Sequence, residues 1–328
     1  MSNTSVNLVM ATVKGDSIAW LDNVHRTREL TSQYSSDSAQ YQRPWRIAKY
    51  VADDQGAPFH PAANKGREAT MFFTYIVDHY DILPDFSIFI HAHEAPWHTE
   101  QALLHSMTET LNLLDLNEVA RRGYTSLRTG HHNACPDWVR TDLAEEESEK
   151  REEPFMYRSF VENFSPTNSS SDIEVPKAFG APCCSQFAVP RATILKRPKS
   201  DYERMLHNLL HTELTDYIYG RTWEHMWQYL FLGKAVDCPV EWKVYCTLYH
   251  VCFPDASELQ HYRELHWEQD NLAAELGLWK DLRHPSEARE KRKKIEWMRN
   301  RSWEMRDDAL RRGLDPTNRK AVGDVYED

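Results

Sequence analysis

The segment Asp85-Phe86-Ser87-Ile88-Phe89-Ile90 runs directly into His91-Ala92-His93-Glu94-Ala95-Pro96-Trp97-His98, and this junction decides the fold. The first six residues are mostly apolar, which indicates a central strand covered on both faces. The next eight carry three imidazoles and a carboxylate. Because ligands gather at the carboxyl ends of strands in open α/β sheets, we expect an active site at this junction.

Strand-like and helix-like segments alternate on both sides of the junction. Apolar runs predict strands at 6–13, 46–52 and 124–128, and apolar residues three and four apart predict helices at 64–80, 103–116, 205–214 and 220–231. This alternation indicates an α/β fold with a mainly parallel central sheet flanked by helices. Asn64 is the expected cap of the first helix.

Composition changes twice along the chain. Residues 141–175 contain the run Glu145 to Glu147 and a stretch rich in Ser and Asn, which predicts an exposed insertion. Beyond Pro254 the sequence is charged with helical spacing, and it ends in a polar tail from Asp315. We therefore expect a catalytic α/β domain over residues 1–254 and a helical, charged C-terminal extension over 255–328.

The composition is that of a soluble, cytoplasmic protein. No apolar run approaches the roughly 18 residues of a membrane span, and the amino-terminal residues lack the pattern of a secretory signal. The six cysteines are few for 328 residues and include the adjacent pair Cys183 and Cys184. We therefore expect free thiols in a reducing compartment and no disulfide framework.

The net charge of −11 argues against a broad nucleic-acid surface, because phosphate binding draws on clustered Lys and Arg. A local basic segment stands out at residues 289–312. That segment is a candidate for a local contact with nucleic acid, and a solvated helix with ion pairs along its length is the alternative.

His91, His93 and His98, with Glu94, are candidates for a general acid and base near neutral pH. Their spacing matches no standard zinc site, and we predict no metal. For any single histidine, a bond to a backbone carbonyl or simple packing beside Trp97 is the alternative.

Three further segments carry candidate groups. Asn64-Lys65-Gly66-Arg67-Glu68 places a glycine between cations at a predicted helix start, which suits an anion, although an ordinary capped helix is the alternative. Cys183-Cys184-Ser185-Gln186 offers a nucleophile, or else small buried side chains. Gly220-Arg221-Thr222-Trp223-Glu224 begins a predicted helix with Glu224 one turn in, where it either turns inward or complements the helix dipole.

Together these segments resemble a largely fungal family long described only as of unknown function. The resemblance covers residues 6–253, and some relatives are identified as arginine-containing cyclodipeptide synthases of secondary metabolism. The front half also resembles a glycosyltransferase of the A-type fold, with His91-Ala92-His93 at the place of the metal-binding Asp-x-Asp. Imidazoles in place of carboxylates remove the usual ligands of Mg²⁺ and Mn²⁺.

The resemblance implies an aminoacyltransferase that forms a diketopiperazine from arginyl-tRNA and a second aminoacyl-tRNA, without a cofactor. It implies proton transfer by His91, His93, Glu94 or His98 and a nucleophile, if an acyl-enzyme forms, at Cys184 or Ser185. A guanidinium would be held by Asp53, Asp54, Glu68 or Glu224, and other substrate contacts would come from Asn64, Arg67, Trp97, Arg128, Gln186 and Arg221. A nucleotide-sugar glycosyltransferase and a non-catalytic binding protein are the alternatives. The second amino acid and the oligomeric state stay open.

Overall fold

The computed structural model describes residues 4–24, 45–142, 150–165, 173–277 and 284–327. It divides into two compact units, Met1–Cys238 and Pro239–Asp328. The boundary predicted at residue 254 is therefore placed too late. The apolar segment 241–253 belongs to the second unit, where the Phe253 ring packs 5.3 Å from that of Tyr262. None of the described helices has the length and apolar character needed to cross a membrane.

The first unit is built on a five-stranded sheet in the order β2-β1-β3-β7-β4. The strands are β1 Val6–Thr12, β2 Arg46–Val51, β3 Phe86–His91, β4 Thr125–Ser126 and β7 Phe187–Pro190. β1 is parallel to β2 and β3, whereas β7 is antiparallel to β3 and β4. The predicted α/β class and strand positions are confirmed, and the sheet is mixed because β7 runs against the other four strands.

Both faces of the central strands are buried, as their apolar character predicts. Val9, Phe89 and Phe187 are in register across β1, β3 and β7, so their side chains share one face. On that face the Phe72 ring lies 5.0 Å from the Phe89 ring. Ile90 points to the opposite face and is fully buried as well. The end of β3 is thus held rigidly between two helical layers.

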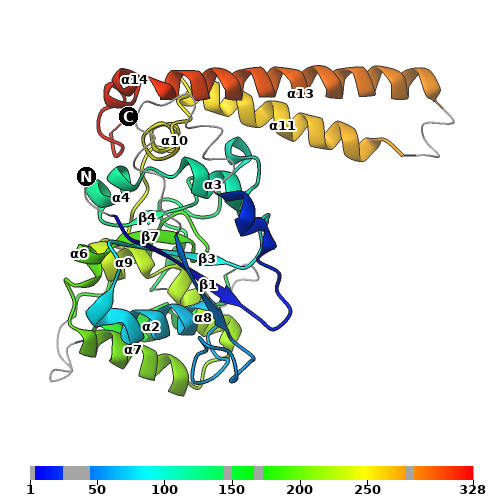
Figure 1. Ribbon diagram of the computed structural model, residues 1–328. Helices are drawn as coiled ribbons and strands as arrows, with labels where there is room; N and C mark the ends of the chain where they lie inside the picture. Colours follow the sequence, from blue (N-terminus) through cyan, green and yellow to red (C-terminus); the bar gives the residue numbers. More distant parts are fainter. Residues whose placement is uncertain (1–3, 25–44, 143–149, 166–172, 278–283, 328) are drawn as a thin grey trace. The chain divides into compact units, whose positions relative to one another are not determined.

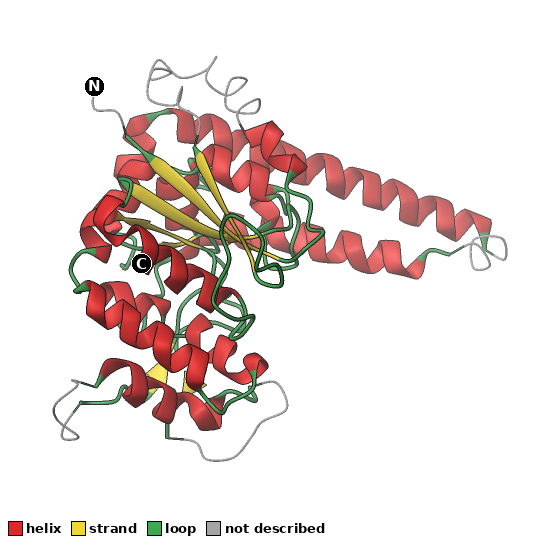
Figure 2. Cartoon of the chain, turned by 60° about the horizontal axis from the view of Figure 1, so that its bottom comes forward, coloured by secondary structure: helices red, strands yellow, loops and turns green. Residues whose placement is uncertain are grey.

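Helices cover the two faces of this sheet (Figure 1). In that view α2 and α7 lie below the strands, and α3 and α4 lie above them. Figure 2 shows the twisted strands between helices from a second direction. The helices of this unit are α2 Glu68–His79, α3 Met107–Leu113, α4 Leu116–Arg122, α5 Met156–Phe164, α6 Arg191–Ile194, α7 Lys199–His211, α8 Asp216–Glu224 and α9 Trp227–Leu232.

Two of the predicted helices are divided. The segment 103–116 forms α3 and part of α4, preceded by a 3-10 turn at Gln101–Leu103. Ser106 and Asp115 each cap a new helix by accepting backbone N–H groups, and this breaks the apolar repeat into pieces. The segment 220–231 is likewise split between α8 and α9. Glu224 is the last residue of α8 rather than a first-turn residue.

The predicted exposed insertion is wrong for its described part. Glu152, Glu153 and Phe160 are fully buried, and α5 packs within the core. The apolar residues of α5 recur every four positions, so one face of this helix can be buried. A small sheet pairs β5 Val139–Arg140 with β6 Ala178–Phe179 on either side of α5 in the sequence. Glu145 to Glu147 and the Ser-rich run 168–171 lie outside the described residues.

All six cysteines are paired, which corrects the expectation of free thiols. Cys135 and Cys238 are 103 residues apart in sequence, and folding brings their Cα atoms to 5.9 Å. The other disulfides join Cys183 to Cys184 and Cys246 to Cys252. Disulfides persist in oxidising compartments and are rare in the cytosol. The cysteine pattern therefore no longer supports the cytoplasmic expectation.

The second unit is helical, as predicted. It contains α10 Glu241–Tyr249, α11 Ala256–Glu275, α13 Pro285–Leu314 and α14 Pro316–Ala321, and α11 and α13 pack side by side (Figures 1 and 2). Lys294 pairs with Glu268 and Lys291 with Glu275, so the basic segment of α13 is laced with ion pairs. The expected polar tail is folded: Val325 is buried, and its carbonyl accepts the Val240 N–H.

Candidate functional site

The candidate residues converge at one edge of the sheet. β1, β2 and β3 are parallel and end at this edge, and β4 runs in the same direction. The antiparallel strand β7 begins there, so the loop that precedes it meets the end of β3. This edge therefore receives Asp53 and Asp54 after β2, the first turn of α2, His91 at the end of β3, Arg128 after β4, and Cys183 to Gln186 before β7.

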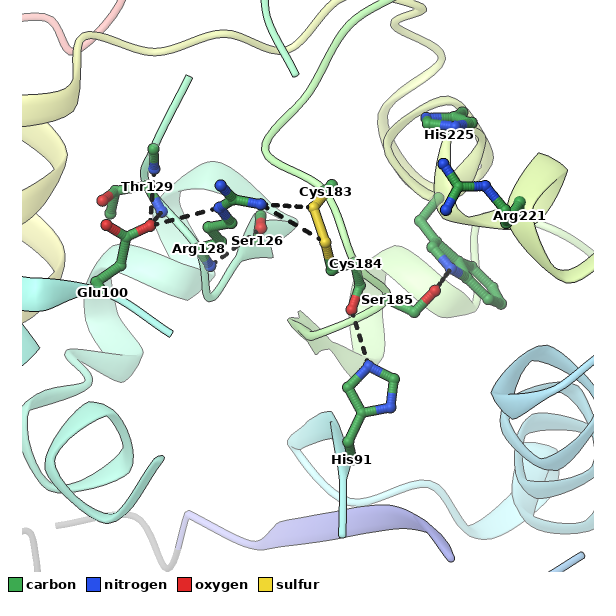
Figure 3. Close-up of a disulfide and its surroundings, with 12 residues drawn as sticks. His91, Glu100, Ser126, Arg128, Thr129, Cys183, Cys184, Ser185, Arg221 and His225 are labelled. Carbon is green, nitrogen blue, oxygen red and sulfur yellow. Dashed lines mark hydrogen bonds and ion pairs between the residues drawn. A yellow bond between two sulfur atoms is a disulfide. The ribbon is translucent and has the colours of Figure 1, made fainter. Parts of the chain in front are cut away.

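His91 is fixed by the loop before β7 (Figure 3). Its Nε2 lies 3.1 Å from the carbonyl oxygen of Cys184. Because a carbonyl only accepts, Nε2 carries the hydrogen, and Nδ1 holds the lone pair in the neutral ring. The backbone N–H of His91 also points at the Gln186 side-chain oxygen, 3.5 Å away. This contact fixes the tautomer of neutral His91 and leaves the Nδ1 lone pair able to accept a proton.

His98 is buried beside His91, with the two ring centroids 5.0 Å apart. Burial lowers the pKa of His98 to about 3, with the charges of His91 and Arg128 adding to the effect and a weak side-chain hydrogen bond with Gln186 partly offsetting it. The ring is therefore neutral at physiological pH. Among the described residues, neither ring nitrogen of His98 has a hydrogen-bond partner of normal geometry.

Glu94 and His93 occupy different surroundings. The Glu94 carboxylate accepts a 2.7 Å hydrogen bond from the Thr108 hydroxyl, and its backbone carbonyl accepts the Met107 N–H. Glu94 therefore holds the start of α3, a structural task beside the proton-transfer role predicted for it. His93 is exposed on the loop.

The loop before β7 has an unusual backbone. Cys184 and Ser185 have φ of 89° and 46°, left-handed values that cost free energy for residues other than glycine. The Cys184 sulfur is bonded to Cys183, and the buried Ser185 hydroxyl accepts a 2.9 Å hydrogen bond from the Trp227 indole. In this form neither side chain is an exposed nucleophile. Their observed contacts hold the loop that orients His91.

Arg128 links this loop to the segment after β3. Its guanidinium donates to the Cys183 sulfur at 2.7 Å and lies 5.7 Å from the centroid of the Trp97 ring. It also pairs with Glu100 at 3.8 Å. The Glu100 carboxylate in turn accepts the backbone N–H groups of Thr129 and Gly130 (Figure 3). Glu100 was not singled out from the sequence, since nothing in its local pattern marks it.

A second group of charged residues surrounds the start of α2. Arg67, with φ of 54°, occupies the cap position in place of the predicted Asn64, which is exposed outside the helix. The Arg67 side chain crosses Gly220 of α8, where an added Cβ would lie 3.0 Å from it. The Arg67 guanidinium lies 5.0 Å from the centroid of the Tyr217 ring. This contact brings the start of α2 against α8.

Glu152 anchors the same group from the segment before α5. Its carboxylate accepts two hydrogen bonds from Arg221, at 2.8 and 2.9 Å, and lies 2.9 Å from His225 Nε2. Burial alone would raise the pKa of Glu152, but the bonds from His225 and Arg221 outweigh it and lower the pKa to about 2. Glu152 therefore stays ionised and fixes Arg221 as its partner.

Glu68 and Glu224 complete this group, which we call the acid–arginine cluster: Arg67, Glu68, Glu152, Arg221, Glu224 and His225. Burial, followed by the negative charge of Glu68, raises the pKa of Glu224 to about 8. Arg221 and Arg67 act in the opposite direction without cancelling the rise. Glu224 is thus mostly protonated at neutral pH, whereas ordinary glutamates are ionised.

Asp53 and Asp54, the other predicted guanidinium ligands, hold loops. The Asp53 carboxylate accepts the Lys14 backbone N–H at 2.6 Å, and that of Asp54 accepts the Gly56 N–H at 3.0 Å. Glu152 and His225 were missed from the sequence. Glu152 follows an acidic run that is typical of a solvated segment, so its burial had no local signature.

The sequence pattern of a family described as "Protein of unknown function (DUF3431)" matches residues 8–247. The chain belongs to this family. The DUF3431 match contains the whole acid–arginine cluster together with His91, His98 and Arg128. No curated protein and no solved structure matches the chain. Among the described residues of this DUF3431 protein, no three His, Cys, Asp or Glu side chains form a group that could hold a metal ion.

Proposed function

We propose that the chain is a tRNA-dependent cyclodipeptide synthase that joins arginine, delivered as arginyl-tRNA, to a second amino acid. The observation that carries the proposal is the pair of carboxylates Glu68 and Glu224 beside Arg67 and Arg221. Together with Glu152, the cluster holds three carboxylates and two guanidinium groups. When all five groups are ionised, the charge of one carboxylate is not balanced by a guanidinium. A bound cation would remove that deficit.

A guanidinium suits this position for three physical reasons. It is planar, it stays charged at every relevant pH, and its five N–H groups can bond two carboxylates at once. Arg221 is already held by Glu152 and so does not fill the role for Glu224. Binding of the substrate guanidinium would ionise Glu224 and stabilise it in that form.

His91 is the proposed base for the amine. In the first step the α-amino nitrogen of one aminoacyl group attacks the ester carbonyl of the other. A C–N bond forms, the C–O bond to the ribose breaks, and the amine proton passes through His91 Nδ1 to the ribose oxygen. The same exchange within the dipeptidyl ester closes the diketopiperazine ring. The ester supplies the driving force, so the scheme uses neither ATP nor a redox cofactor.

We further propose that the scaffold derives from an A-type glycosyltransferase whose chemistry has changed. β1, β2 and β3 are parallel, and His91-Ala92-His93 spans the end of β3 and the start of the next loop, where an Asp-x-Asp would bind a metal-bound sugar nucleotide. Imidazoles suit proton transfer better than they suit the binding of Mg²⁺, which prefers oxygen ligands. Aminoacyl-tRNA as partner would place the reaction in the cytoplasm, where the cysteine pairs would be held reduced.

Expression of the full chain in a bacterial host tests the proposal. We expect an arginine-containing diketopiperazine in the extracts, identified by mass spectrometry and by incorporation of labelled arginine. The Glu68→Gln variant should abolish most of the product, and the Asp81→Asn variant, on an exposed acid, should keep it. Folded protein without any such product would contradict the proposal. Binding of a nucleotide sugar with a divalent ion would favour the glycosyltransferase alternative.

A further inference from the structure

Trp97 is a large aromatic side chain held out from the loop after β3. Its exposed fraction is 80%, and the Arg128 guanidinium lies 5.7 Å from its ring centroid. A cation at this distance holds the indole by a cation–π contact. Because so much of the ring is exposed, its other face is open to a planar ligand. Arg128 is itself held by Glu100 and Cys183, so the position of its guanidinium against the Trp97 ring is fixed.

His98 adds a second, independent indication of a ligand. Its exposed fraction is 9%, and its ring meets the Trp97 ring edge to face at 5.2 Å. Within the described part of the chain, its ring nitrogens have only a weak contact with Gln186 and no hydrogen-bond partner of normal geometry. Buried polar groups are normally partnered, and exceptions point to a missing ligand or water. A neutral imidazole offers one donor and one acceptor together.

The chemistry of the two side chains selects the ligand class. An indole face braced by a guanidinium stacks a planar ring, and neutral His98 calls for a ligand edge with both a donor and an acceptor. A nucleobase has both properties, since adenine presents an amino group beside ring nitrogens. An inorganic phosphate has no face to stack, and an aliphatic chain would leave His98 without a partner.

We infer that Trp97, Arg128 and His98 form a stacking site for a nucleobase, and that this base is the terminal adenine of the aminoacyl-tRNA. The identity of the base rests on the proposed function, because the reacting ester is carried by the terminal adenosine. The site adjoins the proposed base, since the His98 ring lies 5.0 Å from that of His91. Stacking of the adenine would therefore bring the ester toward His91.

Calorimetric titration of the full chain with adenosine 5′-monophosphate tests the site, with inorganic phosphate as the comparison probe. We expect the nucleotide to bind and phosphate to bind more weakly. Trp97→Ala should weaken nucleotide binding by about ten-fold or more, and Trp97→Phe, which keeps a ring, should lose less. Trp267→Ala is the matched control, because Trp267 is 69% exposed in the second unit and should not affect binding.

Equal affinity for phosphate and nucleotide, or nucleotide affinity unchanged in Trp97→Ala, would overturn the inference. Since Trp97 is exposed, its replacement leaves the core intact. The result is separable from the proposed function. If the protein forms a diketopiperazine but Trp97→Ala leaves its nucleotide affinity unchanged, the stacking site is refuted and the proposed function is not. Trp97-dependent nucleotide binding without any diketopiperazine would support the site and count against the synthase.

Discussion

Replacing Glu68 by Gln is expected to weaken the binding of an arginine ester by about 10- to 150-fold, the loss typical of one hydrogen bond to a charged group. The variant keeps the shape of the side chain and removes the charge that faces Glu224. In the free protein the pKa of Glu224 should then fall, because one of its neighbouring negative charges is gone. Calorimetry on the purified chain measures both effects.

Asp81→Asn is the matched control for this result. Asp81 is an acid with 80% of its side chain exposed, paired only loosely with Lys199, and its replacement should leave ester affinity unchanged. Equal losses of ester affinity in both variants would show that the affinity depends on the net charge of the protein rather than on Glu68 and Glu224. An unchanged affinity in folded Glu68→Gln would remove the guanidinium site from the account.

Removing the Glu152 carboxylate should destabilise the chain by about 3–5 kcal/mol, the cost of leaving the Arg221 charge without its buried partner. Glu152 is fully buried and is the shared partner of Arg221 and His225. We expect Glu152→Ala to lower the urea midpoint strongly. Glu162→Gln, which breaks a partly exposed pair with Arg158, should change the urea midpoint little.

The pH dependence gives this prediction a second readout. The folded pKa of Glu152 is depressed from 4.5 to about 2, so its stabilising contribution is fully present above about pH 5. As the pH falls toward 2 the carboxylate is protonated and the contribution is lost. The stability difference between the natural chain and Glu152→Ala should therefore shrink on acidification. A difference that stays constant from pH 7 to pH 3 would contradict the assignment.

Most of the sheet could be predicted from the sequence because its strands carry their own local pattern. β1, β2 and β3 appear as apolar runs, and the end of β3 at His91 was found from the change to polar residues. Helix divisions were missed where a cap interrupts an unbroken apolar repeat, as Ser106 and Asp115 do. Capping depends on a few backbone hydrogen bonds, which residue spacing does not reveal.

Long-range pairing explains the other misses. The Cys135–Cys238 disulfide spans 103 residues, and the Glu152–Arg221 pair spans 69. No local pattern encodes such contacts, so free cysteines and a solvated acidic run were the natural expectations. Arg67 and Glu68 were chosen as candidates from one motif, and Arg221 and Glu224 were chosen from another. That they form one cluster depends on Gly220, whose missing side chain lets Arg67 cross α8.

Proton release on binding tests whether Glu68 and Glu224 form a site for a guanidinium. The probe is N-acetyl-arginine methyl ester, in which the guanidinium is the only charged group. With the Glu224 pKa at about 8, binding at pH 7 should release roughly one proton per site, measured by calorimetry in two buffers of different ionisation enthalpy. At pH 9.5 the release should vanish, and Glu224→Gln should abolish the release seen at pH 7. Binding at pH 7 without proton release, or no binding at all, would contradict the account.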